Sequence, residues 1–171
     1  DPAIGFLPDG SRVAQFRVAE GDAQVGFDGR GAFTFQTGTT AGTLVFKVRL
    51  GEYADELSLP VHPEPVRVEL ARGVRSGSQF ELHVLGFDNT RSVSHMVFTF
   101  FDRNGQPVEP GAQRVDAAAD FSRYFDSAAA GGAFLLRAVF SATGDAQKIA
   151  GADVEIINSL GTARSGRIVF D

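Results

Sequence analysis

The residues that indicate the fold of this chain most clearly are Leu44-Val45-Phe46-Lys47-Val48-Arg49-Leu50. Leu44 and every second residue after it are apolar, whereas Lys47 and Arg49 fall on the opposite face. Alternation with a period of two is typical of a strand with one dry and one wet face, as in antiparallel sheets. The same alternation recurs at residues 11–18, 66–70 and 80–85. These segments predict an all-β chain built from antiparallel sheets.

Turn-forming residues separate the alternating segments. Pro8-Asp9-Gly10 and Asn158-Ser159-Leu160-Gly161 are typical of tight turns. Roughly a dozen short strands with turn signals between them are the pattern of a β-sandwich or barrel. One segment differs, because Phe121, Tyr124 and Phe125 have helical spacing behind Asp120 as a cap. We expect there a single helical turn that crosses between two sheets and closes one end of the core.

The clearest domain boundary is His62-Pro63-Glu64-Pro65. Two prolines in three residues favour an extended, stiff connection and cannot lie inside a central strand. We therefore expect two modules, residues 1–62 and residues 63–171. The second module has the size of a complete seven-strand sandwich. The first is small for a domain without disulfides, so it is expected to lack upstream strands or to rest on the second module.

A weak internal echo supports the division into two modules. Residues 43–61 and residues 152–170 are stretches of equal length at the ends of the two modules. Each has a Leu-Gly pair near its middle, Leu50-Gly51 in the first and Leu160-Gly161 in the second. The echo predicts that each module closes with a hairpin.

Composition excludes several classes of function. Acidic residues outnumber basic ones by 21 to 16, and the net charge of −5 disfavours nucleic-acid binding. No apolar stretch is long enough to span a bilayer, so membrane insertion is not expected. The sequence has no Cys, which removes disulfides, thiolate metal sites and cysteine nucleophiles. The chain begins at Asp1-Pro2 without Met, so we expect it to be a piece of a longer product.

The sequence offers little apparatus for catalysis. His62, His83 and His95 do not have the spacing of local metal ligands. The sequence has no His-Glu-x-x-His, no Gly-x-Ser-x-Gly and no glycine-rich phosphate-binding motif. We therefore expect no catalytic, cofactor-binding or metal-binding residues, and we do not expect an enzyme.

Carbohydrate binding is the alternative function. Flat platforms for sugars favour exposed Trp and Tyr, whose rings combine a broad face with a polar edge. The chain has no Trp, and its two tyrosines are Tyr53 and Tyr124, whereas the other 16 aromatic residues are Phe. An exposed flat patch at either tyrosine would favour a carbohydrate-binding module.

Three segments carry a resemblance to a known group of proteins. Residues 33–44, Phe-Thr-Phe-Gln-Thr-Gly-Thr-Thr-Ala-Gly-Thr-Leu, resemble a recurrent stretch in large uncharacterised exported bacterial proteins. Residues 140–145 and 154–163 are similar to the closing hairpin of tandem immunoglobulin-like repeats in the same proteins. The resemblance implies extracellular β-sandwich repeats without catalytic residues. The chain lacks the Cys pair and core Trp of antibody-type domains, so no antigen-receptor-like role is implied.

Pattern and resemblance together predict two immunoglobulin-like antiparallel β-sandwich modules in tandem, the first incomplete at its N-terminus. The expected function is a non-catalytic spacer, display or adhesion-type module of a longer bacterial protein, located outside the cell or at its surface. Its expected partners are other domains of the same chain or other proteins, with carbohydrate as the alternative. The expected contact residues are Tyr53, His62, Pro63, Pro65 and Tyr124, together with the loop tip at 107–114.

Overall fold

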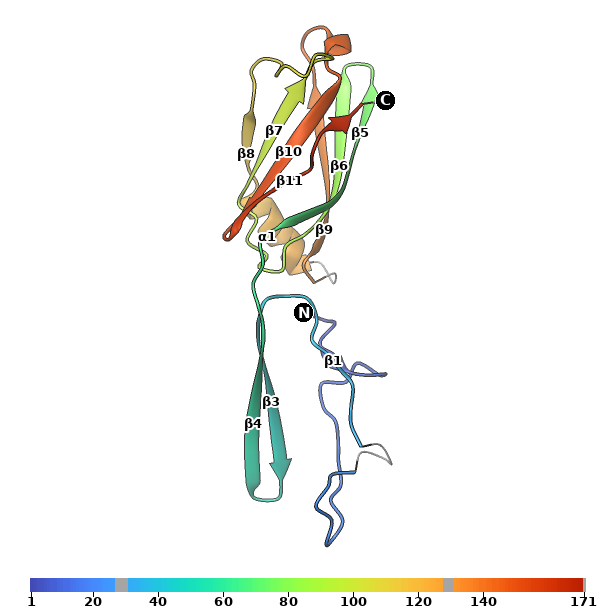
Figure 1. Cartoon of the computed structure of the whole chain (residues 1–171), viewed down its shortest axis with the longest axis vertical. Helices are drawn as coiled ribbons and strands as arrows, with labels where there is room; N and C mark the ends of the chain where they lie inside the picture. The colour runs from blue at the N-terminus through green and yellow to red at the C-terminus, as the bar shows by residue number, and fades with distance from the viewer. Residues whose placement is uncertain (27–30, 128–130, 171) are drawn as a thin grey trace.

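A computed structural model of the chain describes residues 1–26, 31–127 and 131–170. Antiparallel strands dominate its regular structure, so the expected all-β class is confirmed. The strands fall into two regions that lie end to end along the long axis of the molecule (Figure 1). We call residues 66–170 the two-sheet unit and residues 1–61 the N-terminal region.

The two-sheet unit contains a three-stranded and a five-stranded sheet. The first has the order β5–β6–β9, and the second has the order β11–β10–β7–β8, with β12 also paired to β10. The bounds are β5 (Arg67–Ser76), β6 (Gln79–Phe87), β7 (His95–Phe101), β8 (Gln113–Asp116), β9 (Ala133–Ser141), β10 (Gly151–Asn158), β11 (Gly161–Arg164) and β12 (Ile168–Val169). A short 3-10 turn at Ala146–Lys148 precedes β10.

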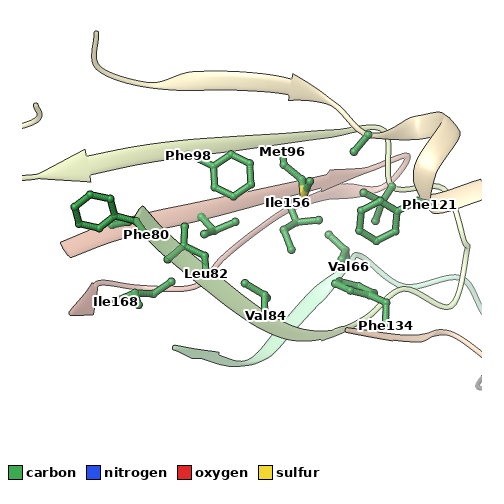
Figure 2. Close-up of a cluster of buried hydrophobic side chains, with 14 of the residues drawn as sticks. Val66, Phe80, Leu82, Val84, Met96, Phe98, Phe121, Phe134, Ile156 and Ile168 are labelled. Carbon is green, nitrogen blue, oxygen red and sulfur yellow. The ribbon is translucent and has the colours of Figure 1, made fainter. Parts of the chain in front are cut away.

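The buried side chains of the two sheets meet in one core. Phe80, Leu82 and Val84 lie at alternate positions of β6, and none is more than 1% exposed. Phe98 of β7 and Ile156 of β10 belong to the same cluster and come from the other sheet (Figure 2). The alternation of residues 80–85 therefore predicted the buried face of β6 correctly.

Strand β5 departs from the alternation that its sequence predicts. A bulge between Val68 and Leu70 shifts its register against β6. Leu70 consequently points outward and is 60% exposed, while Ala71 packs against the core. The expectation that Leu70 shares the buried face of Val66 and Val68 is wrong, because one extra residue reverses the side-chain phase.

The expected helical turn is present as a longer helix, α1 (Ala118–Ser127). It follows β8 and precedes β9, so it crosses from one sheet to the other as predicted. Phe121 and Phe125 are buried, and their ring centroids lie 5.1 and 6.4 Å from that of Phe134. The helix closes the end of the core that faces the N-terminal region (Figure 1).

The residue that caps α1 differs from the prediction. Asp120 lies inside the first turn of the helix. The carboxylate in front of the helix belongs to Asp116, whose Oδ1 accepts a hydrogen bond from Ala118 N at 3.1 Å. The helix begins two residues before Asp120, so that residue cannot serve as the cap.

Within residues 1–26 and 31–61, the N-terminal region has four described strands in two separate sheets. These are β1 (Gly5–Phe6) with β2 (Phe35–Gln36), and β3 (Gly42–Leu50) with β4 (Tyr53–Val61). The pairing of β3 and β4 runs from Gly42↔Val61 to Leu50↔Tyr53, and we call this hairpin the ribbon. Its two-residue turn contains Gly51, whose φ of +59° suits a tight hairpin turn.

The alternating segment at residues 11–18 is not a strand. Only isolated bridges occur there, Phe6↔Ser11 and Arg17↔Gly26. Gly5 is the single buried residue that the structure describes between positions 1 and 61. The prediction of a strand is wrong here, because alternation does not stabilise an extended segment that finds no neighbouring ladder.

Candidate interaction surface

Hydrogen bonds join the N-terminal region to the two-sheet unit at one contact. We call this contact the seam; it is formed by residues 38–41, 62–65, 88–91 and 131–132. Its central side chain is Asn89, which is 5% exposed. Asn89 Nδ2 donates to the carbonyl oxygen of His62 at 2.8 Å, and Asn89 Oδ1 accepts from Glu64 N at 2.9 Å. The carbonyl oxygen of Asn89 accepts from Ala41 N at 2.8 Å. One residue thus holds both the entry to β3 and the proline linker after β4.

A second contact joins Thr39 to the loop before β9. Gly132 N donates to Thr39 Oγ1 at 3.1 Å, and Thr39 N donates to Asp1 Oδ2 at 2.7 Å. A Cβ placed on Gly131 would collide with Thr39 Oγ1. Gly131 also has a φ of +63°, a conformation that favours glycine. The backbone at Gly131 and Gly132 therefore lies directly against the Thr39 side chain at the seam.

A buried carboxylate shapes the loop that carries Asn89. Asp88 is fully buried, and its two oxygens accept from Ser92 N at 2.7 Å, Val93 N at 3.0 Å and Thr90 Oγ1 at 2.6 Å. Asn158 Nδ2 also donates to Asp88 Oδ1 at 3.0 Å from the end of β10. Since each buried oxygen is matched by donors, this network fixes the loop at the seam.

The sequence identified the linker but not the residues that hold it. Asp88, Asn89 and Asn158 are ordinary loop residues in the sequence, and Asn158 stood out as a turn former alone. Asp88 and Asn158 are separated by 70 positions. Only the folding of β6 and β10 into facing sheets brings the two together.

The expected contact residues do not form one patch. His62, Pro63 and Pro65 lie together at the seam and are exposed. Tyr53 lies at the far end of β4, beside the hairpin turn, and is 82% exposed. Tyr124 is on α1, 36% exposed, with its ring 5.4 Å from that of Phe125. The structure therefore separates the two tyrosines, and a platform that uses both is not formed.

The ribbon has one apolar face. Cross-strand partners share a face of an antiparallel pair, and the pairs on this face are Leu44↔Leu59, Phe46↔Leu57, Val48↔Asp55 and Leu50↔Tyr53. Near the seam the face is covered, because the ring of Phe46 lies 4.6 Å from that of Phe35, which in turn lies 5.0 Å from Phe6.

Toward the hairpin turn the same face is open to solvent. The exposed fractions are 82% for Tyr53, 67% for Leu57, 49% for Leu50 and 46% for Val48. Asp55 is the single charged side chain among the residues of this face. Contiguous exposed apolar side chains of this kind mark interaction surfaces more often than isolated ones do. The outer half of the ribbon is the candidate interaction surface.

The two edges of the ribbon carry opposite charges. Among the strands that the structure describes, β3 pairs with β4 alone, so both outer edges lack a neighbouring strand. Lys47 and Arg49 lie on β3, and Asp55 and Glu56 lie on β4. Lys47 Nζ is 3.1 Å from Glu56 Oε1 within the hairpin.

The other end of the molecule has a shallow hollow. It measures about 420 Å³ and its walls include Phe100, Phe140 and Ile149 with Lys148 and Glu109 at the rim. The expected loop tip at 107–114 contributes to it through Val108, Pro110 and Gln113. The buried rings of Phe80 and Phe100 belong to the core, and Ser141, Thr143 and Asp145 also line the hollow, so its lining is mixed apolar and polar.

An ion-paired cluster on β6 and β9 lowers the pKa of Glu81. Arg137 of β9 donates to the carboxylate of Glu81 on β6, which lowers the pKa of Glu81, and partial burial opposes this effect. His83 Nε2 lies 3.1 Å from Glu81 Oε2, so the two side chains share the outward face of β6. In the described ranges no three His, Cys, Asp or Glu side chains converge as metal ligands. The cluster is a cross-strand ion pair on the outer surface of the sheet.

Comparisons with known proteins do not identify a family for this chain. No protein-family model matches the sequence, and a search of curated proteins finds no match. None of the helices described between residues 1 and 170 is long and apolar enough to cross a membrane. The functional conclusion therefore rests on the ribbon and the seam.

Proposed function

We propose that this chain is a non-catalytic structural and interaction module of a longer bacterial protein that acts outside the cell or at its surface. The two-sheet unit is a rigid spacer, and the seam holds the ribbon in a set position in front of it. The observation that carries this proposal is the ribbon itself, an amphipathic hairpin with Leu57 and Tyr53 exposed, anchored by Asn89. Burying such a face would stabilise a contact by roughly 25 cal/mol per Å² of apolar surface.

We propose further that the two-sheet unit has an immunoglobulin-like fold. Such a fold places strands A, B and E in one sheet and strands C, F and G in the other. In chain order from β5, the sheet β5–β6–β9 and the sheet β11–β10–β7 support the same partition. The second and sixth strands, β6 and β10, carry the fully buried Leu82 and Ile156 in a fold whose antibody members have a disulfide between those strands.

The N-terminal region is proposed to be a second, incomplete module of the same kind. The division at residues 1–62 and 63–171 is supported by the proline linker and by a hairpin that ends each part. The open face of the ribbon supports incompleteness, because a closed sandwich would cover it with a second sheet. Placement outside the cell is supported by the resemblance of residues 33–44, 140–145 and 154–163.

Small-angle scattering of the 171-residue chain at low concentration tests the spacer role. We expect the distribution of interatomic distances to match that of one rigid, elongated structure. The Asn89→Ala variant loses two hydrogen bonds that hold the linker, which together contribute about 1–3 kcal/mol, so its distribution should broaden. The control is Asn104→Ala, which alters an exposed turn remote from the seam.

Two results would contradict the spacer proposal. The first is a wild-type chain whose two regions already move independently. The second is an Asn89→Ala variant with the same scattering as the Asn104→Ala control. Either result would mean that the seam does not fix the ribbon.

Carbohydrate binding remains the second candidate, favoured by the exposure of Tyr53. Its ring lies beside Leu50 on the open face of the ribbon, where a sugar ring has room to stack. A glycan array with the wild-type chain and the Tyr53→Ala variant tests this function. Saturable binding that the variant loses would place a carbohydrate site at the hairpin turn.

A further inference from the structure

The ribbon is short of the neighbours that a stable sheet requires. Two-stranded hairpins are marginally stable in water, and three or more strands with an apolar face are needed for independent stability. The outer half of the ribbon, from Val48 to Leu57, has two strands and an uncovered face. A third strand at either edge would supply both backbone partners and apolar contacts.

The charges on β3 and β4 favour one way of pairing the ribbons of two copies. Pairing β3 with β3 would set Lys47 and Arg49 of one copy beside the same residues of the other. Pairing β4 with β4 would likewise bring the acidic residues Asp55 and Glu56 of the two copies together. Like charges directly opposite each other in a sheet are destabilising. Joining β3 of one copy to β4 of another instead sets Lys47 and Arg49 beside Glu56 on one face, while Asp55 lies on the apolar face.

This pairing also preserves strand direction and side-chain faces. Within one ribbon β3 and β4 are antiparallel, so a second ribbon pointing the same way offers β4 antiparallel to the first β3. In a register that keeps the apolar faces together, Lys47 and Arg49 lie on the same face as Glu56 of the second copy. Adjacent strands of a sheet are rotated by roughly 20–25° relative to each other. The second copy is two strands away, so it is rotated by roughly 40–50°, and its two-sheet unit diverges from that of the first copy.

We propose that a second copy of this chain completes the ribbon, its acidic β4 edge adding to the basic β3 edge of the first copy to form one antiparallel sheet. This inference rests on the proposed display role of the ribbon and names its partner. The contact is heterologous, because each copy uses one edge as donor and the other as acceptor. Association therefore continues beyond a pair as concentration rises, and does not stop at a two-fold dimer.

Charge-reversed variants of the full chain test this pairing. Lys47→Glu with Arg49→Glu makes both edges acidic, and Asp55→Lys with Glu56→Lys makes both edges basic. In sedimentation velocity at low ionic strength, we expect the wild type to self-associate and each double variant to do so at least about tenfold more weakly. An equimolar mixture of the two variants should recover association, because acidic and basic edges meet again.

The mixture separates pairing between copies from damage within one hairpin. Each double variant also loses the Lys47–Glu56 contact inside its own ribbon, but mixing two chains cannot restore an internal contact. The control is Arg103→Glu with Lys148→Glu, which changes the net charge as the acidic double variant does, but at exposed sites outside the ribbon, and should associate as the wild type does.

Three outcomes would overturn the proposal. They are a wild type that stays monomeric at millimolar concentration, double variants that associate like the wild type, and a mixture that stays monomeric. Scattering at low concentration reports the seam independently of association. A rigid seam with a monomeric wild type would refute this inference alone, whereas a loose seam would refute the spacer role on which it rests.

Discussion

Strands β3 and β6 have the same kind of sequence and opposite environments. In β6 the alternate residues Leu82 and Val84 are fully buried, whereas in β3 the alternate residues Val48 and Leu50 are 46% and 49% exposed. The difference lies in the neighbours. Strand β6 has a strand on each side and a second sheet over its apolar face, whereas β3 has β4 on one side and cover over its first half alone.

The comparison shows that alternation specifies a strand with an apolar face and leaves open what covers that face. A fully buried leucine contributes roughly 1.5–3 kcal/mol relative to an exposed one. Strand β6 gains that energy inside the chain. In the proposed function, the outer half of the ribbon would gain it only on contact with a second surface, since Leu57 and Tyr53 are exposed within the chain.

The largest expected difference in the free energy of unfolding is between truncating a buried leucine of β6 and truncating an exposed leucine of the ribbon. Leu82→Ala should lower the free energy of unfolding by about 2–5 kcal/mol, because it leaves a cavity between the two sheets. Leu57→Ala should change it by less than about 0.5 kcal/mol, because that side chain is 67% exposed. Urea denaturation of the dilute monomer measures both values. Equal losses would show that the ribbon is covered within a single chain.

The next largest effect concerns the loop that joins the two regions. Asp88→Ala should lower the free energy of unfolding by about 3 kcal/mol, since it leaves the buried amide of Val93 and the partly buried amide of Ser92 without their acceptor. The matched control is Asp102→Ala, which removes a similar acceptor for Asn104 N and Gln106 N in an exposed turn. Denaturation should show a clearly smaller loss for the control, and similar losses would contradict a special role for the buried network.

The smallest effect is a pH dependence on the outer surface of the two-sheet unit. The hydrogen bond from Arg137 lowers the pKa of Glu81 in the folded chain below the ordinary value of 4.5. The folded state therefore binds this proton less readily, so the stabilisation is present above pH 4.5 and is lost as the pH falls through the lowered pKa. The free energies of unfolding of wild type and Glu81→Gln should differ near pH 6 and converge once the pH has fallen below the lowered pKa of Glu81. A difference that stays constant with pH would rule out this ion pair as its source.

Part of the fold was predictable because it depends on local pattern. The alternation at 44–50 and 80–85 identified β3 and β6, and the spacing of Phe121 and Phe125 identified the helix. The prediction failed at 11–18, where no ladder forms, and at Leu70, where a bulge reverses the phase. Both failures concern how a segment pairs with a neighbouring strand, which side-chain periodicity does not encode.

Part of the candidate site was likewise predictable from the sequence, and part was not. The two prolines located the linker, and the residues of the ribbon were visible as an amphipathic strand. The contacts of Asn89 with His62 and Glu64, and the burial of Asp88 beside Asn158, arise from residues far apart in the chain. No local signal distinguishes such polar residues from others in exposed turns.

The sequence by itself determined strands such as β3 and β6 with their apolar faces, the position of the two-proline linker and the opposite charges of β3 and β4, because each depends on residues close together in the chain. The tertiary structure alone decided which apolar faces are buried and which stay open. That choice depends on which distant strands pack together, and here it buried Leu82 and left Leu57 in solvent.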